Sequence, residues 1–115
     1  MSDRLNQGDQ LFHNQSITSG DGRFRLTMQS DGNLVLYRNS DGNPLWASNT
    51  AQTDVNRAIM QGDGNFVLYH VNNAPAWASN TVGAPGSFIV MQNDGNLVIY
   101  RPDLPARWAS NTVQQ

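Results

Sequence analysis

The chain contains no cysteine, no lysine and no glutamate, and each absence narrows what the protein can do. Without cysteine it has no disulfide, no reactive thiol and no thiolate metal site, which is compatible with a reducing compartment. All nine acidic residues are Asp, and three of them recur in equivalent sequence settings, which does not suit the two differently tuned carboxylates that a glycosidase needs. These absences favour a protein that is not an enzyme and that uses no cofactor or metal.

Charge and long apolar runs are also scarce. Nine Asp oppose seven Arg for a net charge of −2, and no basic run is present, which disfavours nucleic acid and anionic membranes as partners. No apolar stretch approaches the roughly 18 residues of a membrane span, and the start of the chain lacks the apolar region of a signal peptide. We therefore expect a cytoplasmic protein or one released without a visible signal. The 23 Asn and Gln residues suit a neutral polar ligand.

The chain is rich in internal repetition. The motif Gln-x-Asp-Gly-Asn-x-Val-x-Tyr occurs three times, at 29–37, 61–69 and 92–100. The string Trp-Ala-Ser-Asn-Thr follows each motif, at 46–50, 77–81 and 108–112. A fixed period indicates one supersecondary unit used three times, and a unit of about thirty residues is too short to bury a core alone. We expect a single domain, 1–115, with repeats at approximately 20–50, 51–81 and 82–112.

Short β-branched and aromatic runs between turn residues predict strands rather than helices. The expected strands are 24–29, 34–38, 58–61, 66–70, 88–92 and 97–101. Each Asp-Gly-Asn predicts a tight hairpin, because Gly and Asn tolerate positive φ. Since side chains alternate along a strand, Leu34 and Leu36 are expected to face inward, while Asn33, Val35 and Tyr37 share the outer face.

The tryptophans recur once in each repeat, and we expect their rings to fill the centre of the domain rather than to stack on a ligand. They are Trp46, Trp77 and Trp108. The two histidines, His13 and His70, lie outside the repeated positions and are expected to be ordinary surface or strand residues. Calcium is also disfavoured, because the Asp-Gly-Asn segment lacks the further oxygen ligands of an EF-hand loop.

The outer face of each motif carries donors and acceptors around one small apolar side chain. Uncharged sugars need this mixture, since each hydroxyl donates and accepts hydrogen bonds above patches of C–H surface. The loops differ between repeats while Gln, Asp, Asn, Val and Tyr do not, which favours ligand contact over duplication alone. Such a shallow site is expected to bind one sugar weakly, on the order of millimolar, so three copies predict multivalent binding.

Three intact motifs, each followed by Trp-Ala-Ser-Asn-Thr, resemble the monocot mannose-binding lectins, the snowdrop agglutinin-like or bulb-type family. The resemblance implies an all-β, β-prism II fold of three four-stranded antiparallel sheets with pseudo-threefold symmetry. It also implies a lectin for α-D-mannose and mannose-rich glycans with up to three equivalent sites. A homodimer that exchanges the C-terminal segment 108–113 is a further implication. The alternatives are a structural or storage-type β-prism protein that has lost sugar binding, and a bacteriocin-like lectin module.

The resemblance assigns a role to each motif position. It implies that Asp31 and Asn33 bind the axial 2-hydroxyl of mannose, Gln29 the 3-hydroxyl and Tyr37 the 4-hydroxyl, while Val35 contacts the ring carbons. The corresponding mannose-binding residues of the other two motifs are Gln61, Asp63, Asn65, Val67 and Tyr69, and Gln92, Asp94, Asn96, Val98 and Tyr100.

Overall fold

The twelve strands of the computed structural model, which describes residues 2–103 and 105–114, form three antiparallel sheets of four strands each. Sheet 1 has the order β3 (Ser16–Thr18), β4 (Phe24–Met28), β5 (Leu34–Arg38), β6 (Asn43–Ala47). Sheet 2 has the order β2 (Gln10–Phe12), β7 (Val55–Met60), β8 (Phe66–His70), β9 (Pro75–Ala78). Sheet 3 has the order β1 (Arg4–Leu5), β10 (Phe88–Met91), β11 (Leu97–Tyr100), β12 (Ala106–Ala109).

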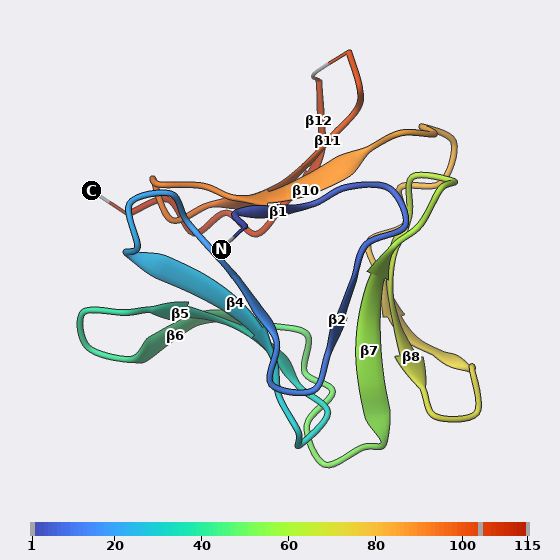
Figure 1. The fold of residues 1–115 in the computed structure, drawn as a ribbon, viewed down its shortest axis with the longest axis horizontal. Helices are drawn as coiled ribbons and strands as arrows, with labels where there is room; N and C mark the ends of the chain where they lie inside the picture. The colour runs from blue at the N-terminus through green and yellow to red at the C-terminus, as the bar shows by residue number, and fades with distance from the viewer. Residues whose placement is uncertain (1, 104, 115) are drawn as a thin grey trace.

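The three sheets lie around a common centre as the sides of a triangle (Figure 1). The extents of the molecule, 36 × 36 × 23 Å, agree with this arrangement, because threefold symmetry makes two of the three dimensions equal. The all-β fold of three four-stranded sheets that the sequence predicts is therefore confirmed. No helix in the described part of the chain is long and apolar enough to cross a membrane.

The N-terminal segment supplies one edge strand to each sheet, which the sequence analysis did not anticipate. Strands β1, β2 and β3 join sheets 3, 2 and 1 in turn, so the segment runs past all three sheets (Figure 1). Each of these strands buries one aliphatic residue: Leu5, Leu11 and Ile17 are 5%, 4% and 2% exposed. Their spacing of six residues is the sequence signal that could have revealed these short strands.

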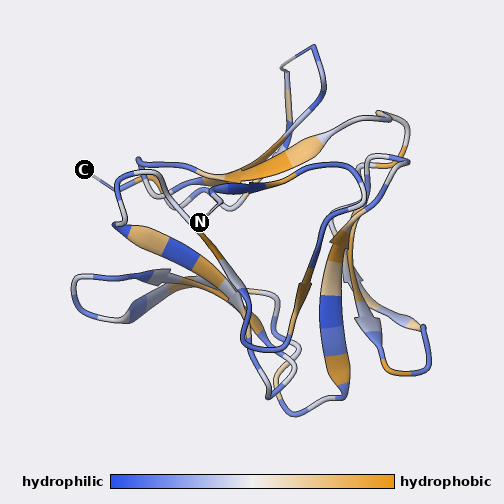
Figure 2. Cartoon of the chain, in the orientation of Figure 1, coloured by the Kyte–Doolittle hydropathy of each residue, from blue (hydrophilic) through white to orange (hydrophobic). Residues whose placement is uncertain are grey.

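Each repeat folds as the alternation of its side chains predicts. In sheet 1, Met28 pairs with Leu34 and Leu26 pairs with Leu36 across the hairpin, and all four side chains are fully buried. Figure 2 shows the corresponding alternation of hydrophobic and hydrophilic bands along β4. The strand ends differ slightly from those expected. Strand β4 ends at Met28 because Gln29 already belongs to the hairpin loop, and β7 begins at Val55 rather than at residue 58.

The three tryptophan rings pack against one another. Trp46 lies 5.5 Å from Trp77 and 5.4 Å from Trp108, and Trp77 lies 5.7 Å from Trp108, each distance joining ring centroids. All three pairs are edge-to-face, with interplanar angles of 74°, 76° and 80°, an arrangement that aromatic quadrupoles favour. The rings are half-buried and pack on the aliphatic core, so one residue from each repeat joins the three sheets.

Candidate functional site

Each motif forms the hairpin between the second and third strands of its sheet. We call the three candidate sites site 1 (Gln29, Asp31, Asn33, Val35, Tyr37), site 2 (Gln61, Asp63, Asn65, Val67, Tyr69) and site 3 (Gln92, Asp94, Asn96, Val98, Tyr100). In site 1 the loop is closed by the Gln29 N–H, which donates to the Asn33 carbonyl at 2.9 Å, and by the Gly32 N–H, which donates to the Gln29 carbonyl at 3.1 Å. Sites 2 and 3 repeat both bonds.

The glycine of each hairpin is required by the backbone. Gly32 has φ of +92°, and a Cβ added there would lie 2.7 Å from the Thr53 carbonyl oxygen and 2.9 Å from that of Thr50. Both features exclude a side chain. The motif asparagine, by contrast, does not have positive φ. The residue with positive φ is the Asn of the Trp-Ala-Ser-Asn-Thr string, which we call the second string. Its φ is 60° at Asn49, and the corresponding Asn of the other two strings also has positive φ.

Asp31 and Asn33 are held by hydrogen bonds within the hairpin and to the second string. The Asn33 N–H donates to Asp31 Oδ1 at 2.9 Å. Asn33 Oδ1 accepts from the Thr50 N–H at 3.2 Å and from Ser48 Oγ at 3.3 Å. Thr50 Oγ1 donates to the Gly32 carbonyl at 2.5 Å. The second string is therefore hydrogen-bonded to the hairpin at both Gly32 and Asn33. Sites 2 and 3 contain the same bonds within 0.1 Å.

These bonds determine which polar groups remain for a ligand. Because Asn33 Oδ1 faces the protein, its Nδ2 group is left with no hydrogen-bond partner among the described residues. None of the buried side-chain nitrogen and oxygen atoms in that part of the chain lacks a partner, so this Nδ2 group is accessible to solvent. Asp31 is exposed and uses Oδ1 internally. Each hairpin thus presents an amide donor beside a carboxylate acceptor. The part that Ser and Thr of the second string play in this orientation was not predicted from the sequence.

Gln29 and Tyr37 meet at the other end of the site. The Gln29 amide contacts the Tyr37 hydroxyl, and the Gln61–Tyr69 and Gln92–Tyr100 pairs do the same. In the orientation that satisfies both of its groups, the Gln29 amide accepts from Tyr37 and donates to Asp31 Oδ1 and Oδ2 at 3.2 and 3.3 Å. The side chains of Gln29, Asp31 and Tyr37 in site 1 therefore form one connected network, which the backbone N–H of Asn33 joins at Asp31.

The motif valines are more covered than expected. Val35, Val67 and Val98 are each 3% exposed, although alternation places them on the outer face. In sheet 1, Val35 pairs with Thr27 on one side and with Ala47 on the other. A ligand in such a site meets only a small apolar contact at the valine.

A β-bulge next to each tyrosine, between Leu36 and Tyr37 in sheet 1, changes the local strand direction at the edge of the site.

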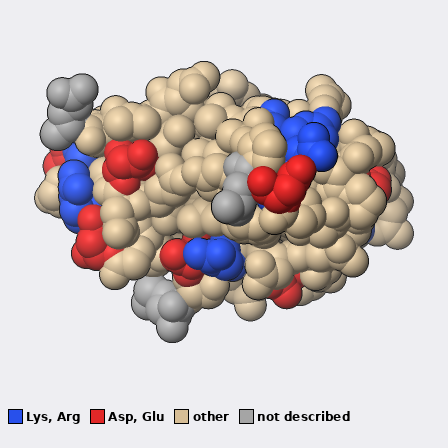
Figure 3. Space-filling model, turned by 90° about the horizontal axis from the view of Figure 1, so that it is seen from above, with Lys and Arg blue, Asp and Glu red and all other residues tan. Residues whose placement is uncertain are grey.

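The two histidines lie outside these sites. The His13 ring contacts the Val55 carbonyl at 2.9 Å, and His70 Nδ1 lies 2.6 Å from Asp54 Oδ1. Among residues 2–103 and 105–114, no three His or Asp side chains are grouped so that they could hold a metal ion. Figure 3 shows the charged side chains of one face as small separate groups on an otherwise uncharged surface.

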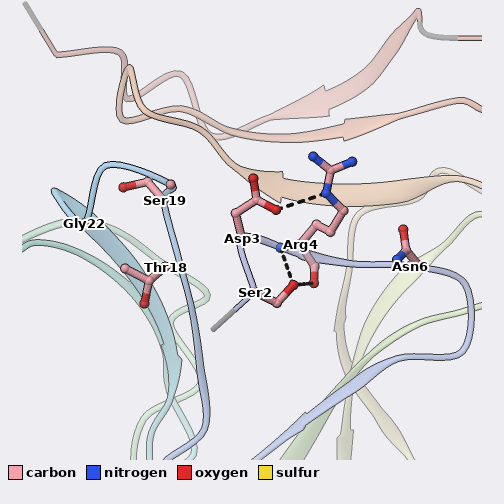
Figure 4. Close-up of a pocket in the computed structure, with 8 residues that line it drawn as sticks. Ser2, Asp3, Arg4, Asn6, Thr18, Ser19 and Gly22 are labelled. Carbon is pink, nitrogen blue, oxygen red and sulfur yellow. Dashed lines mark hydrogen bonds and ion pairs between the residues drawn. The ribbon is translucent and has the colours of Figure 1, made fainter.

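The molecule also has a polar hollow away from the three motifs. It has a volume of about 830 Å³ and lies between β1 and the loop after β3 (Figure 4). Asp3 and Arg4 line it and form an ion pair at 3.0 Å, and Ser19 and Thr18 face it from the other side. Its charges are compensated internally, and its lining includes no motif residue.

Comparisons with known proteins agree on one group of relatives. No family model matches the chain. Among solved structures, the monomeric monocot mannose-binding lectins from Gastrodia elata are 39% identical, with 98% of this chain and 100% of that chain covered and a TM-score of 0.87. The mannose-specific agglutinin from snowdrop (Galanthus nivalis) bulbs, solved with methyl α-D-mannoside, is 40% identical, with 99% and 100% covered and a TM-score of 0.79.

A curated relative from an animal matches part of the chain. The B-type lectin plumieribetin from Scorpaena plumieri is 34% identical over 66 residues, which are 57% of this chain. The match spans 56% of the length of plumieribetin.

Proposed function

The chain belongs to the monocot mannose-binding, or bulb-type, lectins, and we propose that it binds α-D-mannose and mannose-rich glycans through up to three equivalent sites. Lectins bind sugars without converting them, so the protein is not an enzyme. The observation that carries the proposal is the repetition of one hydrogen-bond arrangement in three hairpins, each with a carboxylate and an amide donor left toward solvent.

In the proposed pose, each side chain uses a group that the fold leaves available. Asp31 and the Nδ2 group of Asn33 bind the axial 2-hydroxyl as acceptor and donor. Gln29 binds the 3-hydroxyl, Tyr37 binds the 4-hydroxyl, and Val35 contacts the ring carbons. The Gln29–Tyr37 contact supports this pose, because it fixes both polar groups before a sugar arrives and lowers the entropy lost on binding. Sites 2 and 3 carry the same residues and act in the same way.

One site of this kind binds a monosaccharide weakly. A dissociation constant on the order of millimolar corresponds to about −4 kcal/mol, which suits a few hydrogen bonds and a covered valine. Useful affinity then comes from valency, because a branched glycan held at one site meets the next site at high effective concentration. The three sites lie on three sheets of one body, so a surface with many mannose residues is the favoured target.

Retention on mannose-agarose and elution by free methyl α-D-mannoside test the proposal directly. We expect the triple variant Asp31→Ala, Asp63→Ala, Asp94→Ala to flow through while its circular dichroism spectrum stays that of the folded protein. Asp103→Ala is the matched control, since Asp103 is exposed and pairs with Arg101 outside the motifs. A folded wild-type chain that flows through would refute mannose binding, and retention of the triple variant would refute the site assignment.

The homodimer is a further part of the proposal. Within the single chain, β12 pairs with β11, and Ile99 lies opposite Trp108. Exchange of the segment 108–113 between two chains would form the same pairs with the partner's strand. Size-exclusion chromatography with light scattering distinguishes one chain of 12.7 kDa from two, and a single-chain mass across the working concentration range would refute the dimer.

A further inference from the structure

The three sites differ at the position directly across the hairpin from the tyrosine. Arg25 pairs with Tyr37 and Arg57 pairs with Tyr69, but Phe88 pairs with Tyr100. Figure 2 shows the difference as hydrophilic bands on β4 and β7, whereas β10 is hydrophobic along its length. Because paired residues on one face of a sheet are neighbours, each of these side chains lies beside the tyrosine end of its site.

In sites 1 and 2 the guanidinium group lies over the tyrosine ring. Arg25 Cζ is 4.5 Å from the Tyr37 ring centroid, and Arg57 Cζ is 5.0 Å from that of Tyr69. The corresponding contact in site 3 is between aromatic rings, with the centroids of Phe88 and Tyr100 5.8 Å apart. In sites 1 and 2 the tyrosine therefore lies directly under a guanidinium group. The cation near site 3 is Arg4, which lies over Phe88 instead, 5.5 Å from its ring centroid, and is paired with Asp3 at 3.0 Å.

Neutral groups hold the cations of sites 1 and 2 in place. Arg25 Nη1 donates to Asn39 Oδ1. Arg57 Nη1 donates to Asn56 Oδ1 at 2.9 Å and to the His70 carbonyl at 3.3 Å, and Nη2 donates to Asn73 Oδ1. An amide or carbonyl oxygen orients a guanidinium group without cancelling its charge. Since Arg has five N–H donors, each side chain keeps donors for a ligand.

The carboxylates near these arginines are used elsewhere. In the described part of the chain, no carboxylate lies within ion-pair distance of Arg25 or Arg57. Asp41, on the hairpin after β5, pairs with Arg38 at 2.6 Å, and Asp54 contacts His70. The motif carboxylates Asp31 and Asp63 lie at the hairpin tips, away from the tyrosine end of β5 and β8.

We propose that Arg25 and Arg57 make sites 1 and 2 selective for mannose that carries an anionic group at carbon 6, whereas site 3 does not distinguish it from neutral mannose. This inference rests on the proposed function, because the pose that puts the 4-hydroxyl at the tyrosine also puts carbon 6 beyond it. A phosphate or a carboxylate at that carbon meets a guanidinium group that is already oriented, and charge-assisted hydrogen bonds to Arg favour both anions. Phe88 offers site 3 no such partner.

Titrations followed by ¹H–¹⁵N NMR observe each site separately. The amides of Asn33, Asn65 and Asn96 are the reporters, because each donates to the motif Asp of its own site. The probes are methyl α-D-mannoside, its 6-phosphate, and the mannuronoside with a carboxylate at carbon 6. We expect one or both anionic probes to bind sites 1 and 2 about fivefold more tightly than the neutral one, with no gain at site 3. The gain should shrink between about 0.02 M and about 0.5 M salt.

Three substitutions test the residues themselves. Arg25→Gln should abolish the gain at site 1 and leave site 2 unchanged, and Arg25→Lys should keep part of it. Phe88→Arg should create a gain at site 3, so the proposal stays testable even if an Arg25 variant folds poorly. Equal binding of neutral and anionic probes at all three sites would overturn the inference and leave the lectin function standing. The inference would also be overturned if inorganic phosphate alone shifted the reporter amides of sites 1 and 2 as much as the 6-phosphate of methyl α-D-mannoside does. No shift with methyl α-D-mannoside at any site would refute the proposed function itself.

Discussion

Replacement of Gly32 by alanine, compared with the same replacement at Gly42, measures how closely residues 50–53 pack on the hairpin. Both glycines have positive φ, +92° and +70°. The added Cβ at Gly32 would lie 2.7 Å from the Thr53 carbonyl oxygen and 2.9 Å from that of Thr50, whereas at Gly42 it meets nothing within 4 Å. The pair therefore shares the backbone strain and differs in the steric overlap.

The two expected losses of stability follow from these contacts. The left-handed conformation costs an alanine about 1–2 kcal/mol. The lower conformational entropy of the unfolded alanine variant offsets about 0.4–1 kcal/mol of this, so Gly42→Ala should lose about 1 kcal/mol of stability. Overlap with backbone that cannot move freely adds about 1–3 kcal/mol, so Gly32→Ala should lose about 2–4 kcal/mol. At about 4 °C per kcal/mol for a chain of this size, Tm should fall by about 8–16 °C for Gly32→Ala and by about 4 °C for Gly42→Ala.

Differential scanning calorimetry and urea unfolding give both values. If the two variants lose the same stability within error, residues 50–53 do not pack closely on the hairpin and the reasoning is refuted. Mannose titration of Gly32→Ala adds a second readout: site 1 should weaken, because Asp31 is placed by this hairpin, while sites 2 and 3 keep their affinity.

Three further outcomes are expected. Thr50→Val keeps the shape of the side chain but removes the donor to the buried Gly32 carbonyl, so urea unfolding should show a loss of about 1–3 kcal/mol. The hydrogen bond from Arg38 lowers the pKa of Asp41 from 3.8 to about 2, so this pair stabilises the fold above about pH 4 and the contribution is lost as the pH falls toward 2. Asp41→Asn should remove that part of the acid dependence followed by circular dichroism, and equal acid dependence of both proteins would contradict it. Trp77→Ala should cost about 3–5 kcal/mol and Trp77→Phe less, because only the phenyl ring keeps part of the ring packing.

Several features of the molecule follow from the amino-acid sequence alone. The repeated Asp-Gly-Asn predicts three hairpins, and alternation along the third strand of each sheet separates buried Leu34 and Leu36 from the polar residues of the site. Local backbone geometry and the twofold period of a strand decide these features, and both act within a few residues. The three four-stranded sheets and the lectin family were predictable only through the resemblance of the three motifs to the monocot mannose-binding lectins.

The remaining features depend on contacts between residues that are distant in the chain. Asn33 is oriented by Ser48 and Thr50, 15 and 17 residues away, and alternation alone gave no sign that Val35 would be nearly covered. The edge strands near the N-terminus are too short for alternation within a strand to reveal them. The six-residue spacing of their buried aliphatic residues hints at them, but only pairing with the repeats decides which sheet each one joins. Sequence thus identified the residues of the three candidate sites. Tertiary structure decided which of their donors and acceptors face solvent, because burial and hydrogen bonding depend on neighbours that the chain brings together only when it folds.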